Sequence, residues 1–591
     1  MNALDWAVLI ATQVLIIAYG VWKTRKQSKN LQGYLLSDRD MNWFTIGLSI
    51  MATQASAITF LSTPGQAFGN GMGFVQFYFG LPIAMVILSI TAVPIYHKLN
   101  VYTAYEYLEN RFDLKTRSLG AALFLTQRGL AAGLSIYAPA IILSTVLGWN
   151  IYYLIVIIGI VVIAYTVFGG TKAVSQTQKQ QMLVILIGMV AAGYILVSLL
   201  PKEVSVTDAL SVAGAVGRLE VINLDFDLNN RYNVWSGIIG GLFLALSYFG
   251  TDQSQVQRYL TGKSIAQTRV GLLMNGMVKI PMQFLILLVG IFLFAFYQFY
   301  QPPIFFNTNK KTTFIQENPT KADSLKNIET LYTQNFEEKK QVIFEFLEAK
   351  KDAESKNVEL DTMYASRIRT YNAQNDTLRN QATAIINNIE KGNKLEAKRL
   401  SNNDLDYAFI NFVLDYLPIG LIGLLVSVML SAAMSSASSE LNALGSTTVI
   451  DIYKRSIAKD KDEEHYVKAS KGFTMFWGVY AIFFAMLATQ LDNLIQAVNI
   501  LGSLFYGTIL GIFLVAFYIK KVKSNAVFYA AVVSESIILI HYFFFRETFE
   551  IGFLWYNLIG CVMVILMGIL FEMLLKNDTE DKNNQILDSE T

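Results

Sequence analysis

Long apolar runs alternate with short polar connections along most of the chain. A run of about 18 or more apolar residues is long enough to cross a bilayer as a helix. Thirteen such spans are predicted, at residues 4–23, 43–69, 73–96, 119–147, 150–168, 181–200, 235–251, 270–299, 417–440, 472–489, 494–518, 525–545 and 553–575. The pattern predicts an all-α polytopic membrane protein with about 13 transmembrane helices in contact with the lipid bilayer.

Composition agrees with this class and excludes others. The 591 residues are 53% hydrophobic and only 16% charged, which is not typical of a soluble protein. The 47 basic and 45 acidic residues nearly balance, so the charge gives no indication of a nucleic-acid partner. One cysteine and three dispersed histidines exclude a disulfide framework and a transition-metal centre. Gly262-Lys263-Ser264 lacks the first glycine of a phosphate-binding loop, because Gln257 stands there. No nucleotide-driven step is indicated, so any transport would have to use an ion gradient.

Basic residues predict the orientation of the spans. Lysine and arginine gather after spans one, three, five, seven, nine and eleven, and such loops are typically cytoplasmic. They are Lys23, Arg25, Lys26, Lys29, Lys98, Arg111, Lys115, Arg117, Lys172, Lys179, Arg258, Lys263, Arg269, Lys454, Arg455, Lys459, Lys461, Lys520, Lys521 and Lys523. The connections at 70–73, 147–150 and 489–493 contain neither residue. The N-terminus is therefore expected outside and the C-terminus inside.

Three segments lie outside the spans. Residues 301–404 are rich in Lys, Glu, Asn and Gln with apolar residues at helical spacing, which predicts a helical insertion. We place it outside, because long segments cross membranes largely regardless of charge, and it leaves room for an external partner. Residues 201–234 are predicted as an external loop, and 577–591 as a disordered cytoplasmic tail.

Serine and asparagine form a stripe in the ninth span. Ser435, Ser438, Ser439 and Asn442 recur at three- and four-residue intervals, so they share one helix face, and Glu440 follows within the same turns. Such a stripe suits either a bare cation or a close helix–helix seam.

Two spans contain helix-weakening polar segments. The second span holds Ala52-Thr53-Gln54-Ala55-Ser56 and Thr63-Pro64-Gly65, and the seventh ends in Ser247–Gln253. A broken helix frees carbonyl oxygens, which are tolerated at membrane depth only where they line a cavity or hold an ion. The breaks lie five spans apart and so enter from opposite faces, which predicts a LeuT-like 5+5 inverted repeat. The predicted organisation is 1–42 (first span and cytoplasmic loop), 43–200 (repeat one), 235–300 with 405–518 (repeat two) and 519–576 (spans twelve and thirteen).

Four ionisable residues interrupt apolar spans: Arg128, Lys279, Glu440 and Glu535. Each costs about 2.5–3.5 kcal/mol on insertion scales, so each is a functional hypothesis. The alternative for each is snorkelling or a structural ion pair.

These residues resemble those of the sodium:solute symporter family, which includes sodium-coupled sugar, iodide, monocarboxylate, proline and sialic acid carriers. The resemblance covers nearly all of the chain except 301–404 and the tail. Its motifs are Ser49–Ala57, Phe168–Val174, Thr251-Asp252-Gln253, Val256–Leu260 and Ser435-Ser436 followed by Asp451–Lys454.

The resemblance implies one sodium site. A second sodium site is doubtful, because one of its expected ligands is absent. The first would use the carbonyl oxygens of Ala52, Ala55 and Ala432 and the hydroxyls of Ser435 and Ser436. The second would use Ser435, Ser438 and Ser439 with an aspartate that is Gln178 here. The lost carboxylate favours one ion, with Glu440 as the alternative source of charge. Na⁺ is the only metal and coupling ion expected, and no cofactor is expected.

The resemblance also implies a substrate pocket. The candidate residues are Ser56, Thr59, Tyr78, Arg128, Tyr248, Lys279 and Gln496. Tyr248 matches a cytoplasmic-side gate and Lys279 a substrate-site lysine, while Thr59 and Ala245 replace sugar-contacting residues. Ser56, Thr59 and Arg128 are similar to a sialic acid carrier's pocket, and a desolvated arginine binds carboxylates in a bidentate manner.

The sequence therefore predicts a secondary active transporter that couples Na⁺ influx to uptake of a small organic solute. We prefer an organic anion or acidic sugar, such as sialic acid or a monocarboxylate. A neutral sugar or polyol is the alternative. An ion channel, a membrane-embedded enzyme and a transporter-like sensor are weaker rivals, because no filter repeat, nucleophile motif or kinase-like extension is evident. The plasma (inner) membrane of a bacterium is the expected location.

Overall fold

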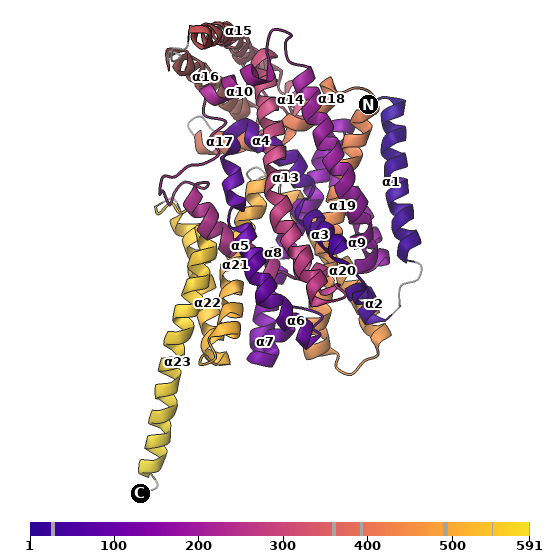
Figure 1. Cartoon of the computed structure of the whole chain (residues 1–591), viewed down its shortest axis with the longest axis vertical. Helices are drawn as coiled ribbons and strands as arrows, with labels where there is room; N and C mark the ends of the chain where they lie inside the picture. Colours follow the sequence, from indigo (N-terminus) through magenta and orange to yellow (C-terminus); the bar gives the residue numbers. More distant parts are fainter. Residues whose placement is uncertain (25–29, 357–361, 390–393, 489–493, 547, 590–591) are drawn as a thin grey trace.

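The protein is a helical bundle with a smaller group of helices at one end (Figure 1). The computed structural model describes residues 1–24, 30–356, 362–389, 394–488, 494–546 and 548–589. Within these ranges there is no β-strand, and an isolated bridge joins Met41 to Gly262. The all-α prediction is confirmed. Arg25, Lys26, Lys29 and the 489–493 connection lie outside the described residues.

Long apolar helices form the body of the bundle. Among the described residues, nine helices are long and apolar enough to cross a membrane, or ten if one bent pair counts as a span. Eight of these spans involve α8 (Leu114–Leu147), α9 (Ile151–Ser198), α13 (Ile265–Phe299), α19 (Leu421–Thr447), α20 (Glu463–Leu487), α21 (Leu494–Tyr518), α22 (Ser524–Ile540) and α23 (Trp555–Ser589), and the ninth is Met72–Leu99. The body also contains α1 (Ala3–Thr24), whose apolar stretch Ala3–Ile16 is shorter. The multi-pass membrane class is thus established, while the number of 13 spans stays a prediction.

Shorter helices connect and extend these elements. They are α2 (Leu31–Leu36), α3 (Trp43–Gln54), α4 (Ala57–Asn70), α5 (Leu81–Ile90), α6 (Ala92–Leu99), α7 (Glu106–Arg111), α10 (Val206–Ala215), α11 (Gly241–Gly250), α12 (Gln253–Leu260) and α18 (Ala408–Tyr416). Short 3₁₀ turns are η1 (Ser37–Arg39), η2 (Met72–Tyr78) and η4 (Leu405–Tyr407), and π-helical turns are η3 (Ser236–Gly240), η5 (Thr448–Ile457) and η7 (His541–Phe545).

Both predicted helix breaks are present. The second span divides into α3 and α4, whose axes differ by 57°, and the chain between them passes through non-helical Ala55 and Ser56. The seventh span divides after α11, where Thr251 leaves helical geometry and Asp252 caps α12 by accepting a hydrogen bond from the Ser254 amide. The breaks arise where small and polar side chains compete with the helix backbone.

Two predicted non-helical segments are helical instead. The expected cytoplasmic loop at 169–180 continues α9, because polarity alone does not end a helix and no proline lies between Ile151 and Ser198. The polar tail predicted as disordered is helical through Ser589, as an extension of α23. Its Glu, Lys, Gln and Leu residues are compatible with a helix.

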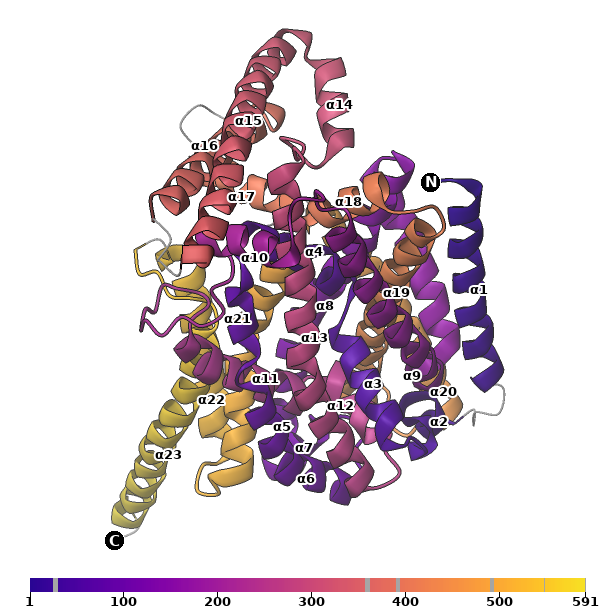
Figure 2. The same cartoon turned by 45° about the horizontal axis from the view of Figure 1, so that its top comes forward.

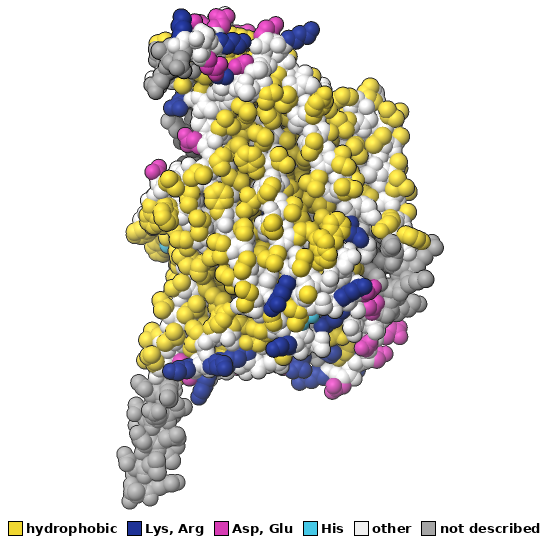
Figure 3. All heavy atoms as spheres, viewed as in Figure 1, with side chains coloured by type: hydrophobic (Ala, Val, Ile, Leu, Met, Phe, Trp, Pro, Cys, Tyr) yellow, Lys and Arg dark blue, Asp and Glu magenta, His cyan; other side chains and the backbone are white. Residues whose placement is uncertain are grey.

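The insertion consists of α14 (Thr308–Glu317), α15 (Pro319–Lys356), α16 (Thr362–Ile386) and α17 (Lys394–Asp404). It lies at the same end as the N-terminus, whereas α23 runs toward the opposite end (Figure 1). In Figure 2 the insertion stands over the ends of α4, α10 and α13. Hydrophobic side chains cover the visible side of the bundle, and Lys and Arg gather near the end opposite the insertion (Figure 3). This distribution matches a membrane belt with one basic face.

Candidate functional site

The break between α3 and α4 faces the hydroxyl stripe of α19. The Ser436 hydroxyl donates toward the carbonyl oxygens of Ala52, at 3.4 Å, and Thr53, at 3.3 Å. Ser435, one residue earlier, is buried, and its hydroxyl has no hydrogen-bond partner among the described residues. The predicted sodium-site residues Ala52, Ala55, Ala432, Ser435 and Ser436 are all buried. Oxygen atoms converging at a helix break with one unsatisfied hydroxyl are a fitting donor set for Na⁺.

The residues considered for a second sodium ion make several different contacts. Gln178 accepts a hydrogen bond from the Ser49 hydroxyl at 2.6 Å and donates to the hydroxyls of Thr53 and Ser439 at 3.1 and 3.0 Å. Ser438 donates instead to the Ser435 carbonyl oxygen at 3.0 Å. Glu440 pairs with Arg128. The Gln178 amide thus hydrogen-bonds residues of α3 and α19 from α9, and its N–H groups donate to the Thr53 and Ser439 hydroxyls. The resemblance implies an aspartate at this position in some family members.

A cavity of about 80 Å³ lies beside the break, between α4, α8, α11, α19 and α21. Five predicted substrate residues line it: Ser56, Thr59, Tyr78, Arg128 and Tyr248. The other lining residues are Thr53, Gln54, Ile58, Phe77, Ser135, Leu244, Glu440, Ile495, Val498, Asn499, Gly502 and Tyr506. The structure therefore brings together residues that lie hundreds of positions apart in the sequence.

Two predicted substrate residues lie outside this lining. The Lys279 ammonium is 5.5 Å from the ring centre of Tyr78 and makes no hydrogen bond among the described residues. Gln496 donates to the Gln66 side chain at 3.1 Å and accepts from Arg231. Lys279 therefore contacts the Tyr78 ring without lining the cavity itself. Gln496 belongs to a separate polar cluster with Gln66 and Arg231. Glu535, in α22, does not line the cavity either.

Arg128 is the centre of a buried ion cluster. Its guanidinium donates to Asp252, to Tyr506 and, at 3.1 Å, to Glu440. The Tyr506 hydroxyl also donates to Asp252 at 2.8 Å, and the guanidinium lies 5.3 Å from the Tyr248 ring centre. Arg128 of α8 thus contacts α12 and α19 through two carboxylates and α21 through the Tyr506 hydroxyl. A substrate carboxylate would have to replace Glu440, whose second oxygen has no partner among the described residues.

Sequence reasoning missed Asp252 and Tyr506 as site residues. Asp252 belonged to a recognised motif, and its position at a helix break was the signal for a role beyond capping. Tyr506 and Asn499 are polar residues in the predicted eleventh span, a signal of the same kind as Arg128.

An apolar helical bundle with interrupted helices meeting at buried oxygen atoms defines a multi-pass membrane protein of the transporter class. The family model of the sodium:solute symporter family matches residues 34–316 and 390–534, most of the chain, and the protein belongs to that family. The unmatched residues 317–389 fall within the insertion. The family is one of symporters, so an enzyme function is excluded.

Characterised relatives and a solved structure agree with this family. The chain is 33% identical over 278 residues to the human sodium-coupled monocarboxylate transporter 1, covering 46% of this chain and 44% of that protein. It is 30% identical over 301 residues to the human sodium/iodide cotransporter, covering 50% and 46%. These matches span less than half of each relative. A Na⁺-coupled sialic acid symporter, solved substrate-bound and outward-open, shares the fold with a TM-score of 0.71 at 21% identity, covering 97% of this chain and 98% of that one.

Proposed function

We propose that the protein is a Na⁺-coupled symporter that takes up a small organic solute by alternating access. The contact that carries this proposal is the one between the α3–α4 break and α19, where Ser436 reaches the Ala52 and Thr53 carbonyl oxygens and Ser435 keeps an unsatisfied hydroxyl. Membership of the symporter family and the names of its relatives support the same function.

The ion would act by joining two mobile parts. Na⁺ held by Ala52, Ala55, Ala432, Ser435 and Ser436 bridges α3–α4 and α19 and stabilises the form that accepts substrate from outside. Inward opening separates these elements, so the ion leaves into low cytoplasmic sodium and the substrate follows past Tyr248. Because ion and substrate favour the same conformation, each strengthens the binding of the other. The 13 spans, the 5+5 repeat, an external N-terminus and a bacterial plasma membrane belong to this proposal.

A small organic monoanion is the preferred substrate. The central cavity of about 80 Å³ is smaller than most ligand sites, which enclose roughly 300–1,000 Å³. This size favours a monocarboxylate over an acidic sugar in the present conformation. The named substrates of both human relatives, monocarboxylates and iodide, are anions. On binding, the anion would take the place of Glu440 beside Arg128.

A neutral solute is the second candidate, and the ion cluster favours it. Arg128 already faces two carboxylates, Asp252 and Glu440, so no uncompensated positive charge is left for an anion. Hydroxyls of Ser56, Thr59 and Ser135 in the lining would hydrogen-bond a neutral polar solute.

Uptake into proteoliposomes tests the proposal. We expect a monocarboxylate to enter faster with an inward Na⁺ gradient than without one, in a panel that includes sialic acid, galactose and myo-inositol. Ser436→Ala should raise the Na⁺ concentration for half-maximal uptake about tenfold, the effect of losing one ligand worth about 1.4 kcal/mol. Ser446→Ala is the matched control, because the hydroxyl of this serine on the same helix donates to the Ala443 carbonyl oxygen and not to the predicted sodium site. Unchanged Na⁺ dependence in Ser436→Ala would refute the site.

Arg128→Ala separates the two substrate classes. Loss of monocarboxylate uptake in a variant that keeps the wild-type elution volume supports the anion, since the guanidinium would contact the carboxylate. Uptake of a neutral solute in wild type, with no monocarboxylate uptake, supports the second candidate. Absence of Na⁺-driven uptake for every solute class would contradict the transporter proposal itself.

A further inference from the structure

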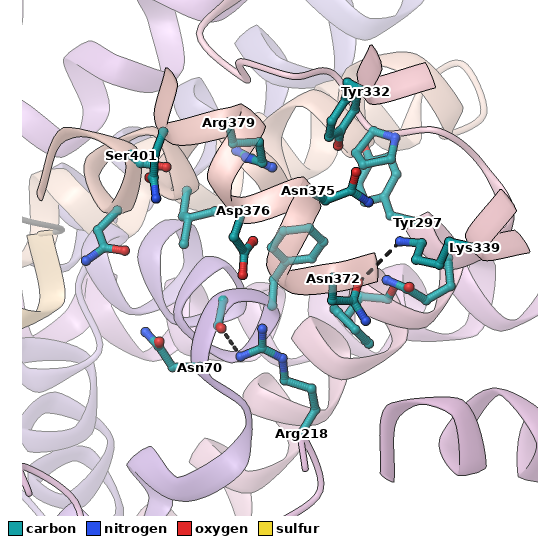
Figure 4. Close-up of a pocket in the computed structure, with 18 residues that line it drawn as sticks. Asn70, Arg218, Tyr297, Tyr332, Lys339, Asn372, Asn375, Asp376, Arg379 and Ser401 are labelled. Carbon is teal, nitrogen blue, oxygen red and sulfur yellow. Dashed lines mark hydrogen bonds between the residues drawn. The ribbon is translucent and has the colours of Figure 1, made fainter. Parts of the chain in front are cut away.

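A second, larger cavity lies where the insertion meets the body of the protein (Figure 4). Its volume is about 360 Å³, within the range of small-molecule sites. The ends of α4 and α13 contribute to its lining, together with α15, α16 and α17, Arg218, Pro302 and Leu405. Because 317–389 are absent from the family match, much of this lining is particular to the insertion.

Two cations in this cavity have no hydrogen bond to a carboxylate within the part of the chain that the structure describes. Lys339, on α15, is 2% exposed, and its ammonium donates at 3.3 Å to the neutral amide of Asn372. Arg218, in the segment after α10, donates to the Gly69 carbonyl oxygen, and its Nε has no partner among the described residues. In Figure 4 both side chains extend toward the same space from different elements. A third cation, Arg379, is balanced by Asp404 at 3.1 Å.

Asp376 is the carboxylate in the lining, and it is exposed. Two positive charges therefore face one solvent-screened negative charge. Lys339 is buried and Arg218 is partly buried. A desolvated cation without a close counter-ion is costly, and an incoming anion would reduce that cost. The cavity thus has the charge of an anion site.

The remaining lining combines apolar rings with unsatisfied polar atoms. Phe68, Phe294 and Tyr332 supply buried aromatic surface. The Tyr297 hydroxyl, 1% exposed, and Asn372 Nδ2 have no hydrogen-bond partner among the described residues. Both can donate to an oxygen, and buried donors rarely stay unpaired in the presence of a ligand. An apolar body with one carboxylate matches this arrangement.

We propose that this outer cavity binds a small carboxylate with an apolar body, held by Lys339 and Arg218 and packed against the aromatic rings. The site goes beyond the transport function, since binding here needs neither Na⁺ nor the central cavity. The two cavities lie near opposite ends of α4. Gly69 and Asn70 line the outer cavity, and Ser56 and Thr59 line the central one. Ten residues from Thr59 to Gly69 correspond to about 15 Å along the helix.

Equilibrium binding to the purified full-length protein tests this site. The probe is benzoate, with benzamide as the uncharged analogue of nearly the same shape, in Na⁺-free, low-chloride buffer. We expect saturable binding of benzoate and at least tenfold weaker binding of benzamide, because a charge-assisted bond to a buried cation contributes about 1.5–3 kcal/mol. Absence of saturable benzoate binding up to millimolar concentration, or equal binding of benzamide, would overturn the proposal.

Three variants locate the bound probe. Lys339→Gln and Arg218→Gln should each weaken benzoate binding by about tenfold or more. Lys351→Gln, a change of the same type at an exposed position on α15, should leave it unchanged. Thermal melting of each variant confirms folding, and full affinity in both cavity variants would overturn the assignment. Ser436→Ala should bind benzoate like wild type, so a failure of the sodium site and a failure of this site are distinguishable.

Discussion

We propose that Gln178 limits the number of sodium ions that the protein couples to one. Its neutral amide bonds Ser49, Thr53 and Ser439, so no carboxylate is available at that point for a second ion. We therefore predict that uptake depends on Na⁺ with a Hill coefficient near one, since this coefficient is bounded by the number of sites.

Gln178→Asp should add the missing charge and raise the Hill coefficient toward about two. Gln178→Asn, a shorter neutral amide, is the matched control and should keep the value near one. Na⁺ titrations of initial uptake rates measure both. A wild-type coefficient near two would show that the amide does not prevent a second ion from binding.

Lys339 should make the outer site sensitive to pH. Burial lowers the pKa of its ammonium group to about 7, and Asp376 opposes this shift. The side chain faces Asn372 and Asp376 of α16, with Arg218 across the cavity. A lysine with a lowered pKa loses its charge as the pH rises through 7.

Benzoate should therefore bind more tightly at pH 6 than at pH 8.5. A bound carboxylate favours the charged lysine, so the loss of affinity should begin somewhat above pH 7. Binding isotherms across this range measure the effect. Lys339→Arg, which stays charged throughout, should remove the pH dependence, and an equally steep profile in that variant would assign the titration to another group.

Several residues of the central site were predicted from the sequence, whereas the hydrogen bonds of Arg128 were not. A polar interruption indicated Arg128 and helical spacing indicated Ser435, because such residues are costly in an apolar span. The roles of Ser436 and Tyr248 were expected from the family resemblance. Asp252 and Tyr506 became partners of Arg128 only through the packing of α12 and α21 against α8. Sequence periodicity gives the face of a helix but not which neighbour that face meets.

At the level of elements, α4 packs closely against η4 because Gly65 of α4 has no side chain. A Cβ added at Gly65 would overlap the carbonyl oxygen of Leu405, a backbone atom that cannot rotate away. Gly65→Ala should therefore separate α4 from η4 and destabilise the protein by about 1–3 kcal/mol, the usual cost of overpacking. Because α4 lines both cavities, uptake should fall as well.

Thermal melting and initial uptake rates measure this prediction. Gly472→Ala is the matched control, since nothing lies within 4 Å of an added Cβ there. Alanine favours helices over glycine by up to about 1 kcal/mol, so the control should melt at the same or a higher temperature. Equal melting of the two variants would mean that α4 and η4 move apart freely.

The order of elements could be predicted better than their ends. The breaks after Gln54 and Gly250 were predicted from Ser, Thr, Pro and Gly in apolar runs, and both are present. The 169–180 loop was wrong, because hydropathy reports polarity while helix termination depends on proline, caps and packing.

At the scale of the whole molecule, the two ends differ in charge and architecture. The insertion and the N-terminus share one end, and Lys and Arg gather near the other (Figures 1 and 3). Near that basic end Arg455 of η5 pairs with Glu109 of α7, which places η5 beside α7. Basic loops remain in the cytoplasm. The insertion, and with it the outer cavity, is then expected to face the external medium.

Labelling of single introduced cysteines tests this orientation. The natural cysteine, Cys561, is fully buried and should not react, so Lys351→Cys in α15 and Lys459→Cys in the η5–α20 loop can be read directly. Both positions are exposed. An inner-membrane-impermeant maleimide should label Lys351→Cys in intact cells and Lys459→Cys only after permeabilisation. The reverse pattern would place the insertion in the cytoplasm, and the outer cavity would then bind a cytoplasmic carboxylate instead of an external one.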